Sequence, residues 1–116
     1  MARMKIDSYS FGRMVVAGME YDKDLIILPN KLLLNWWRKA GHIFAPDDFI
    51  EVLSEDLELM ILGLGAYGLV KVEPELEKIF HSKGIECRSF YTARAVKAFN
   101  ENCLLKKTAG AFHLTC

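Results

Sequence analysis

Residues 57–63 (LELMILG), 85–91 (IECRSFY) and 109–116 (AGAFHLTC) decide the fold of this chain of 116 residues. Each is a short run of the kind that forms a β-strand, and we expect strands near 57–62, 86–91 and 109–114. Two helical patterns separate these runs, near 74–83 and 93–102. Strand, helix, strand, helix, strand at this spacing predicts right-handed crossovers and a small parallel βαβαβ unit.

The expected helices have recognisable starts and ends. Pro74 is suited to the first turn of the second helix, and Gly84 to the position just beyond its end. Pro46, followed by two aspartates, predicts an earlier helix over 46–54. Thr92 is the expected N-cap of the third helix.

The first third of the chain has a different pattern of apolar and turn residues. Short apolar runs separated by turn residues predict a β meander with strands near 6–11, 14–19 and 24–28. Residues 31–38, which include LLLNWW, fit either a strand or a short buried helix. The length suits one domain covering 1–116, of the α/β class.

The run at 109–116 is apolar through to Cys116, which indicates that the last strand is part of the core. Side chains alternate along a strand, so Cys116 is expected with Phe112 and Leu114, and His113 on the other face. This argues against a Cys–His catalytic pair. We expect Cys116 to be a mostly buried structural thiol and His113 a hydrogen-bonded core or rim histidine.

Composition narrows the classes of function. The formal net charge is zero, with 15 basic and 15 acidic residues, which argues against nucleic-acid binding and eases self-association, including a homodimer. No apolar run approaches the length of a membrane span, and the start, MARMKID, has neither signal-peptide nor transit-peptide character. These features predict a cytoplasmic protein in which Cys87 and Cys103, like Cys116, are reduced thiols.

The glycine loop at 63–68 (GLGAYG) matches the dinucleotide-binding pattern GxGxxG. A nucleotide site also needs a helix that opens at the second glycine, yet residues 69–72 look extended. Two other interpretations remain. The glycines form a sharp turn, or Gly63, Gly65 and the start of the Thr92 helix offer backbone N–H groups to a small anionic ligand.

Three further residues are candidates for function. His42 follows a glycine in a predicted loop and is a candidate ligand-binding residue. Trp36 and Trp37 are adjacent, so in a strand one would point inward and the other toward solvent or a partner. Both are interface candidates. No spacing of His and Cys predicts a metal site, and we expect no cofactor.

Taken together, the chain resembles a small family of unknown function. That family includes archaeal and bacterial proteins, a mitochondrial complex I assembly factor family and an adipogenesis-associated protein. The resemblance spans nearly the whole chain and rests on an ordered set of residues: Gly18, Tyr21, Trp37, Gly41, His42, Asp48, Gly63, Leu64, Gly65, Thr92, Ala95, Asn100, His113 and Cys116.

The resemblance implies a three-layer β/β/α arrangement and favours a strand at 31–38. It implies no established enzymatic activity, and its mitochondrial members look like assembly factors that act through protein contacts. We therefore expect a non-enzymatic protein-interaction or assembly protein without catalytic residues. The alternative is a small anionic-ligand binder or an unrecognised enzyme that uses His42, Gly63, Gly65 and Thr92.

Overall fold

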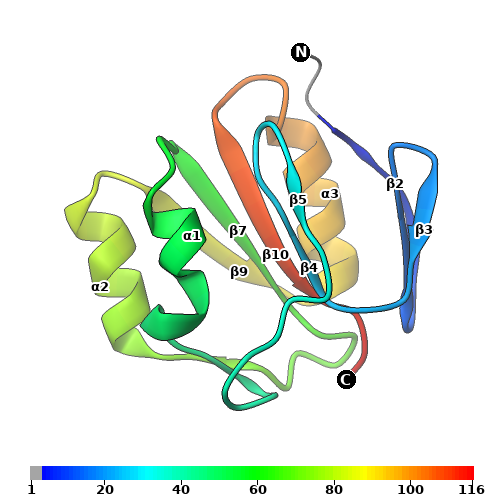
Figure 1. The fold of residues 1–116 in the computed structure, drawn as a ribbon, viewed down its shortest axis with the longest axis horizontal. Coiled ribbons are helices and arrows are strands. Elements are labelled where there is room, and N and C mark those ends of the chain that lie inside the picture. Colours follow the sequence, from blue (N-terminus) through cyan, green and yellow to red (C-terminus); the bar gives the residue numbers. More distant parts are fainter. Residues whose placement is uncertain (1–3) are drawn as a thin grey trace.

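The computed structural model describes residues 4–116 and centres on a five-stranded mixed sheet (Figure 1). Its strand order is β5 (Leu32–Leu33), β4 (Leu25–Ile27), β10 (Thr108–His113), β7 (Leu59–Leu64) and β9 (Glu86–Phe90). Strand β10 pairs in parallel with β7, which pairs in parallel with β9. The predicted parallel unit is therefore confirmed.

A second sheet holds β1 (Ile6–Ser10), β2 (Arg13–Val16) and β3 (Met19–Tyr21), all antiparallel. The predicted meander is wrong in its third strand, which is β3 and not the run at 24–28. Ala17 and Gly18 have φ of 48° and 82°, and two consecutive positive φ values make the tight turn that returns the chain into β3.

Strand β4 instead joins the central sheet, where it pairs antiparallel with β10. All three of its residues are buried, with Ile26 in one core cluster and Leu25 and Ile27 in the other. A strand that is apolar on both faces needs cover on both faces, and the small sheet alone could not supply it.

The helices cover both faces of the central sheet. A 3-10 turn, η1 (Pro46–Phe49), leads into α1 (Ile50–Leu53), and with α2 (Pro74–Ser82) they pack on one face. On the other face α3 (Thr92–Asn102) shares a layer with the small sheet (Figure 1). The α/β class is confirmed. The layers follow the expected β/β/α order, namely the small sheet, the central sheet, and α1 with α2, and α3 lies in the same layer as the small sheet. No helix within residues 4–116 combines the length and apolar character needed to cross a membrane.

The stretch 31–38 is the largest local departure from expectation. Only Leu32–Leu33 form a strand, because Asn35 adopts a left-handed φ of 50° and turns the chain away from the sheet edge. A further short parallel pair joins β6 (Ile43–Phe44) to β8 (Lys71–Val72), which brings the loop at 38–42 beside the loop after β7.

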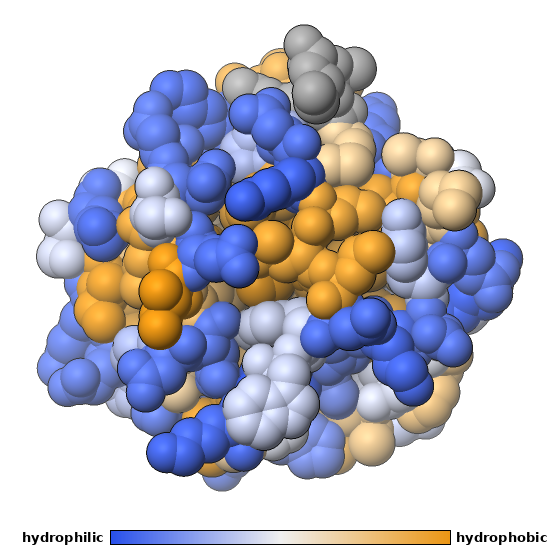
Figure 2. Space-filling model, in the orientation of Figure 1, coloured by the Kyte–Doolittle hydropathy of each residue, from blue (hydrophilic) through white to orange (hydrophobic). Residues whose placement is uncertain are grey.

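The core lies on both faces of β10, whose six residues are all buried. Ala109 and Ala111 face the α1–α2 side, and Phe112 faces α3, as the predicted alternation requires. Asn100 fastens α3 to the small sheet, since its amide donates to the Ile6 carbonyl and accepts from the Ile6 N–H. Figure 2 shows apolar surface in the middle of the viewed face, over β4 and β5, with hydrophilic side chains around it.

Candidate functional site

Three of the buried polar residues, Arg38, Thr92 and His113, lie at the end of the central sheet where β7, β9 and β10 stop. Strand β10 ends at His113, and β4 begins opposite it because Phe112 is paired with Leu25. Asp24, one residue before β4, therefore lies beside His113. The antiparallel pairing of β4 with β10 thus brings the Asp24 carboxylate to the His113 imidazole.

Asp24, Arg38 and His113 form one hydrogen-bonded group. Oδ2 of Asp24 lies 2.6 Å from Nδ1 of His113 and 2.8 Å from Nη1 of Arg38. Oδ1 of Asp24 accepts the Leu114 N–H at 2.8 Å. Both oxygens are thus satisfied, as a largely buried carboxylate requires.

Arg38 is 92% buried, although arginine is seldom found inside a protein. Its Nη2 and Nε donate to the Gly41 carbonyl at 2.5 and 3.2 Å. The guanidinium also lies 4.8 Å from the Trp36 ring centroid and 5.3 Å from that of Phe44. These contacts anchor the 34–41 loop to the end of β10 through Asp24.

The charge state of Asp24 follows from these contacts. Burial by itself raises the pKa of the carboxyl, but hydrogen bonds from His113, the Leu114 N–H and Arg38 outweigh burial, so the pKa lies below its ordinary value. An ionised carboxylate only accepts hydrogen bonds. The shorter contact, from Asp24 to Nδ1, therefore places a proton on Nδ1 of His113, with Nη2 of Arg38 a more distant neighbour at 3.3 Å.

Gly63, Gly65 and Thr92 come together at the same end of the sheet. The side-chain hydroxyl of Thr92 accepts the Gly65 N–H at 2.8 Å and donates to the His113 carbonyl at 2.7 Å. The expected N-cap role is wrong: the helix begins at Thr92 itself after Tyr91, and no side-chain cap bond forms. Because Thr92 is wholly buried, its hydroxyl joins the ends of β7 and β10 to the start of α3.

Close packing leaves little room for a side chain at either loop glycine, against side chains at Gly63 and against backbone at Gly65. A Cβ at Gly63 would lie 3.0 Å from the Phe112 ring, and this glycine is inside β7, which runs to Leu64 and not to 62 as predicted. Gly65 has φ of 102°, and a Cβ there would lie 2.7 Å from the Cys116 carbonyl oxygen. The sharp-turn interpretation fits these contacts. The loop is followed by β8 and then α2, in agreement with the extended conformation predicted for residues 69–72.

Two of the N–H groups proposed for an anion, those of Gly65 and Thr92, are already engaged. Gly65 donates to Thr92, Ala66 donates to the Thr115 carbonyl, and the Thr92 N–H donates to the Gly65 carbonyl. The segment at 114–116 thus closes over the glycine loop. Anion binding by Gly63, Gly65 and Thr92 stays a prediction, with the N–H groups of Gly65 and Thr92 already taken.

His42, the fourth ligand candidate, lies beside His113 and not beside the glycines. Its exposed ring meets the His113 ring edge-on, with 5.4 Å between centroids. Its backbone carbonyl accepts the Lys71 N–H, which holds the loop against β8. His42 therefore belongs to the site through its contact with the ring of His113, a residue that was expected to be structural.

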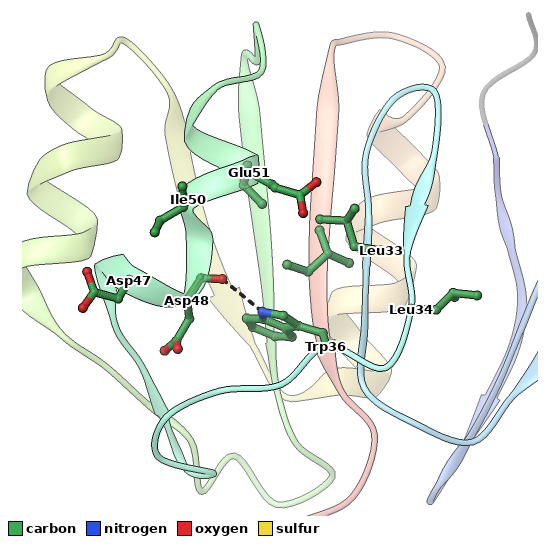
Figure 3. Close-up of a pocket in the computed structure, with 9 residues that line it drawn as sticks. Leu33, Leu34, Trp36, Asp47, Asp48, Ile50 and Glu51 are labelled. Atoms are coloured by element: carbon green, nitrogen blue, oxygen red, sulfur yellow. Dashed lines mark hydrogen bonds between the residues drawn. The ribbon is translucent and has the colours of Figure 1, made fainter.

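The two tryptophans point in opposite directions, as expected, although they do not lie in a strand. Trp36 packs edge-on against Phe49 and tilted on Phe44, and its Nε1–H donates to the Asp48 carbonyl at 3.0 Å (Figure 3). It borders a hollow of about 290 Å³ between β5 and α1. Trp37 is 80% exposed. Their role at an interface stays a prediction.

The cysteines need one correction. Strand β10 stops at His113 because Asp24 takes the Leu114 N–H out of the ladder, and Cys116, beyond the strand, is only half-buried. Cys103 is buried in the core with its thiol near the Asn100 carbonyl. Burial, with Glu77 nearby, raises the pKa of the Cys87 thiol to about 12, which makes it unreactive.

Sequence reasoning missed Asp24 and Arg38, the two charged members of the site, and it missed Thr115. The Oγ1 of Thr115 lies 3.4 Å from Nε2 of His113. One signal was available: Asp24 directly precedes an apolar strand and stands between charged and apolar runs. Its partner could be found only by knowing that β4 pairs with β10.

Comparison with known proteins places the chain in a family. A family model described as a protein of unknown function (DUF498/DUF598) matches residues 6–113, so the chain belongs to that family. The expected resemblance is thereby confirmed. The family carries no assigned activity, and the site has to be interpreted from its own geometry.

Solved structures share the whole fold. Conserved hypothetical protein PH1505 from Pyrococcus horikoshii OT3 is 26% identical, covering 97% of this chain and 99% of that one with a TM-score of 0.83. A protein described as an outer membrane protein from Bartonella henselae is 22% identical, covering 99% and 98% with a TM-score of 0.84. A Bordetella pertussis protein described as a Mth938-like domain is 13% identical, covering 95% and 85% with a TM-score of 0.66. The last two show the fold alone.

Proposed function

We propose that this chain is a cytoplasmic, non-enzymatic protein-interaction protein of the assembly-factor type. The observation that carries the proposal is a set of four strongly exposed aromatic residues at one end of the central sheet. They are Phe11, Trp37, Tyr67 and Tyr91, exposed by 57%, 80%, 63% and 60%. Aromatic side chains dominate the binding energy of protein interfaces, and exposing several of them without a partner disfavours solubility.

These four residues surround the segment at 113–116. The rings of Phe11 and Tyr67 are 6.2 Å apart. Gly12, next to Phe11, donates its N–H to the Leu114 carbonyl, and Gly68 lies under the Tyr91 ring. Trp37 and Thr115 border the same hollow. We name these residues the aromatic rim.

The polar cluster beneath the rim gives less support to an enzyme. Asp24, His113 and Thr115 stand in the order of a nucleophile triad, but hydrolytic catalysis also needs donors for an oxyanion. Two backbone N–H groups at this end of the sheet, those of Gly65 and Ala66, are hydrogen-bonded within the chain. The cluster is better suited to holding the rim loops in one geometry.

The test compares two equally exposed apolar residues at opposite ends of the sheet. Trp37 is in the rim, and Leu105, 79% exposed, follows α3 at the end where β10 begins. We expect Trp37→Ala to lose a specific partner in crosslinked pull-downs from the native host, and Leu105→Ala to keep it. Loss in both variants, or in neither, would contradict the role of the rim.

Sedimentation of the purified chain adds the second arm of the test. If the partner is a second copy of this chain, the wild-type protein and Leu105→Ala sediment as dimers and Trp37→Ala as a monomer. A dimer that survives Trp37→Ala and forms through another face would contradict the proposal for self-association. Folding of each variant is checked by its thermal transition.

A further inference from the structure

Beside the aromatic rim, a hollow of about 430 Å³ has the Asp24–His113 pair as its floor. That volume is within the range of small-molecule sites in proteins. The hollow is also lined by Trp36, Trp37, Asn35, Lys23 and Asp22. The hollow is separate from the one between β5 and α1, whose polar side chains belong to η1 and α1 (Figure 3).

The imidazole at the floor has one nitrogen committed and one available. Nδ1 donates to Asp24, so in the form of the ring that carries a single proton Nε2 has a lone pair and can only accept. Nε2 lies 3.4 Å from the Thr115 hydroxyl, which is long for a hydrogen bond from a hydroxyl.

Both ring nitrogens of His113 lie close to side chains that line the hollow. The His113 side chain is 91% buried, and the residue that contacts Nε2, Thr115, itself lines the hollow. Nδ1 is already engaged by Asp24, which lines the hollow too, and lies near Arg38. A buried acceptor with a weak partner therefore borders a space large enough for a ligand.

The surroundings define what the ligand would be. The exposed Trp37 indole suits an aromatic ring. The opposite charges of Asp22 and Lys23 offset each other at the edge, and the Asp24 charge is paired with Arg38, so nothing selects for a charged ligand. We propose that this hollow binds a small uncharged aromatic compound whose O–H or ring N–H donates to Nε2 of His113. This binding site goes beyond the interaction role, which needs no such acceptor.

The test uses two probes of nearly the same shape, p-cresol and 4-methylanisole, of which only the first can donate a hydrogen bond. Titrations follow the side-chain ¹⁵N resonances of His113 and Trp37 in the folded chain. We expect p-cresol to bind in about the millimolar range, typical of so small a ligand, and about fivefold to tenfold more tightly than 4-methylanisole. Nε2 of His113 should shift with p-cresol only.

Variants identify the groups involved. Trp37→Ala should weaken both probes alike, and His113→Phe should remove the difference between them. Because His113→Phe can disturb folding, Thr115→Val is the second variant: it removes the competing hydroxyl and should tighten p-cresol binding while leaving 4-methylanisole unchanged. Ile50→Ala, in the hollow beside α1, is the matched control and should alter neither probe.

N-acetyltyrosinamide is the third probe, and it distinguishes the source of the ring. Binding of p-cresol alone indicates a free small molecule, and binding of both indicates that a tyrosine of a partner also fits. Equal affinities for p-cresol and 4-methylanisole, shifts centred on Ile50, or no saturable shift up to about 10 mM would overturn the proposal. None of these results depends on the partner assay for the aromatic rim.

Discussion

The two ends of the central sheet carry similar groups in opposite surroundings. Where β7 and β10 end, Arg38 pairs with Asp24, and the side chains are 4% and 16% exposed. Where the same strands begin, Lys107 pairs with Asp56, and the side chains are 49% and 85% exposed. The first pair belongs to a network that includes His113 and backbone groups, whereas the second lies on the surface.

The two pairs differ in the free energy of desolvation, which is high for the buried pair and low for the surface pair. Desolvating Asp24 and Arg38 costs several kcal/mol, which the pairing offsets only if every remaining donor and acceptor is satisfied. Here each buried side-chain nitrogen and oxygen of the pair has a partner, and His113, Leu114 and Gly41 supply the further ones. We infer that the network is kept because it holds the loops that carry the aromatic rim, and not because it adds net stability.

The largest expected effect comes from breaking the buried pair. Asp24→Ala leaves the Arg38 guanidinium and the Leu114 N–H without their acceptor, and should lower the free energy of unfolding by about 3–5 kcal/mol. Asp56→Ala, the matched change at the other end, should cost no more than about 0.5 kcal/mol. Urea unfolding measures both, and similar losses in the two variants would contradict the contrast.

A smaller effect is expected from two buried threonines. Thr92→Val removes the partner of the Gly65 N–H and the His113 carbonyl and should cost about 2–3 kcal/mol. Thr108 is buried at the other end, where its hydroxyl makes longer contacts, 3.2 and 3.4 Å, with the Lys106 and Asn102 carbonyls. Thr108→Val should cost about 1 kcal/mol or less. The reverse order in thermal or urea unfolding would show that the ends do not differ in this way.

The smallest effect is the acid dependence of stability. The pKa of Asp24 is lower in the folded chain than in the unfolded one, so its contribution is complete above the unfolded value, about 3.9, and is lost as the pH falls through the folded value. Asp24→Asn should remove that part of the slope below about pH 4, which is at most about 1.4 kcal/mol per pH unit. Unfolding at a series of pH values checks this, with Asp56→Asn expected to follow the wild type.

The elements of the parallel unit could be predicted because they depend on local signals. Apolar runs located β7, β9 and β10, and Pro74 and Gly84 set the ends of α2. The boundary of β7 was shifted because a glycine usually stops a strand, whereas Gly63 continues one to make room for the Phe112 ring.

The site could not be predicted, because its contacts join residues far apart in the chain. Asp24 and His113 are 89 residues apart, and they meet only because β4 pairs with β10. A doubly buried strand such as β4 looks the same in a meander and in a central sheet. Thr92 illustrates the same limit, since a threonine before a helix suggests a cap, while its actual partners are 27 and 21 residues away.

Two double-mutant cycles test most directly the claim that the end where the parallel strands stop is held by a buried charge network. One combines Asp24→Ala with Arg38→Met, and the other combines Asp56→Ala with Lys107→Met. We expect a coupling energy above about 1.5 kcal/mol for the buried pair and below about 0.5 kcal/mol for the surface pair. Equal coupling energies, or a buried pair that couples no more strongly than the surface pair, would contradict the account.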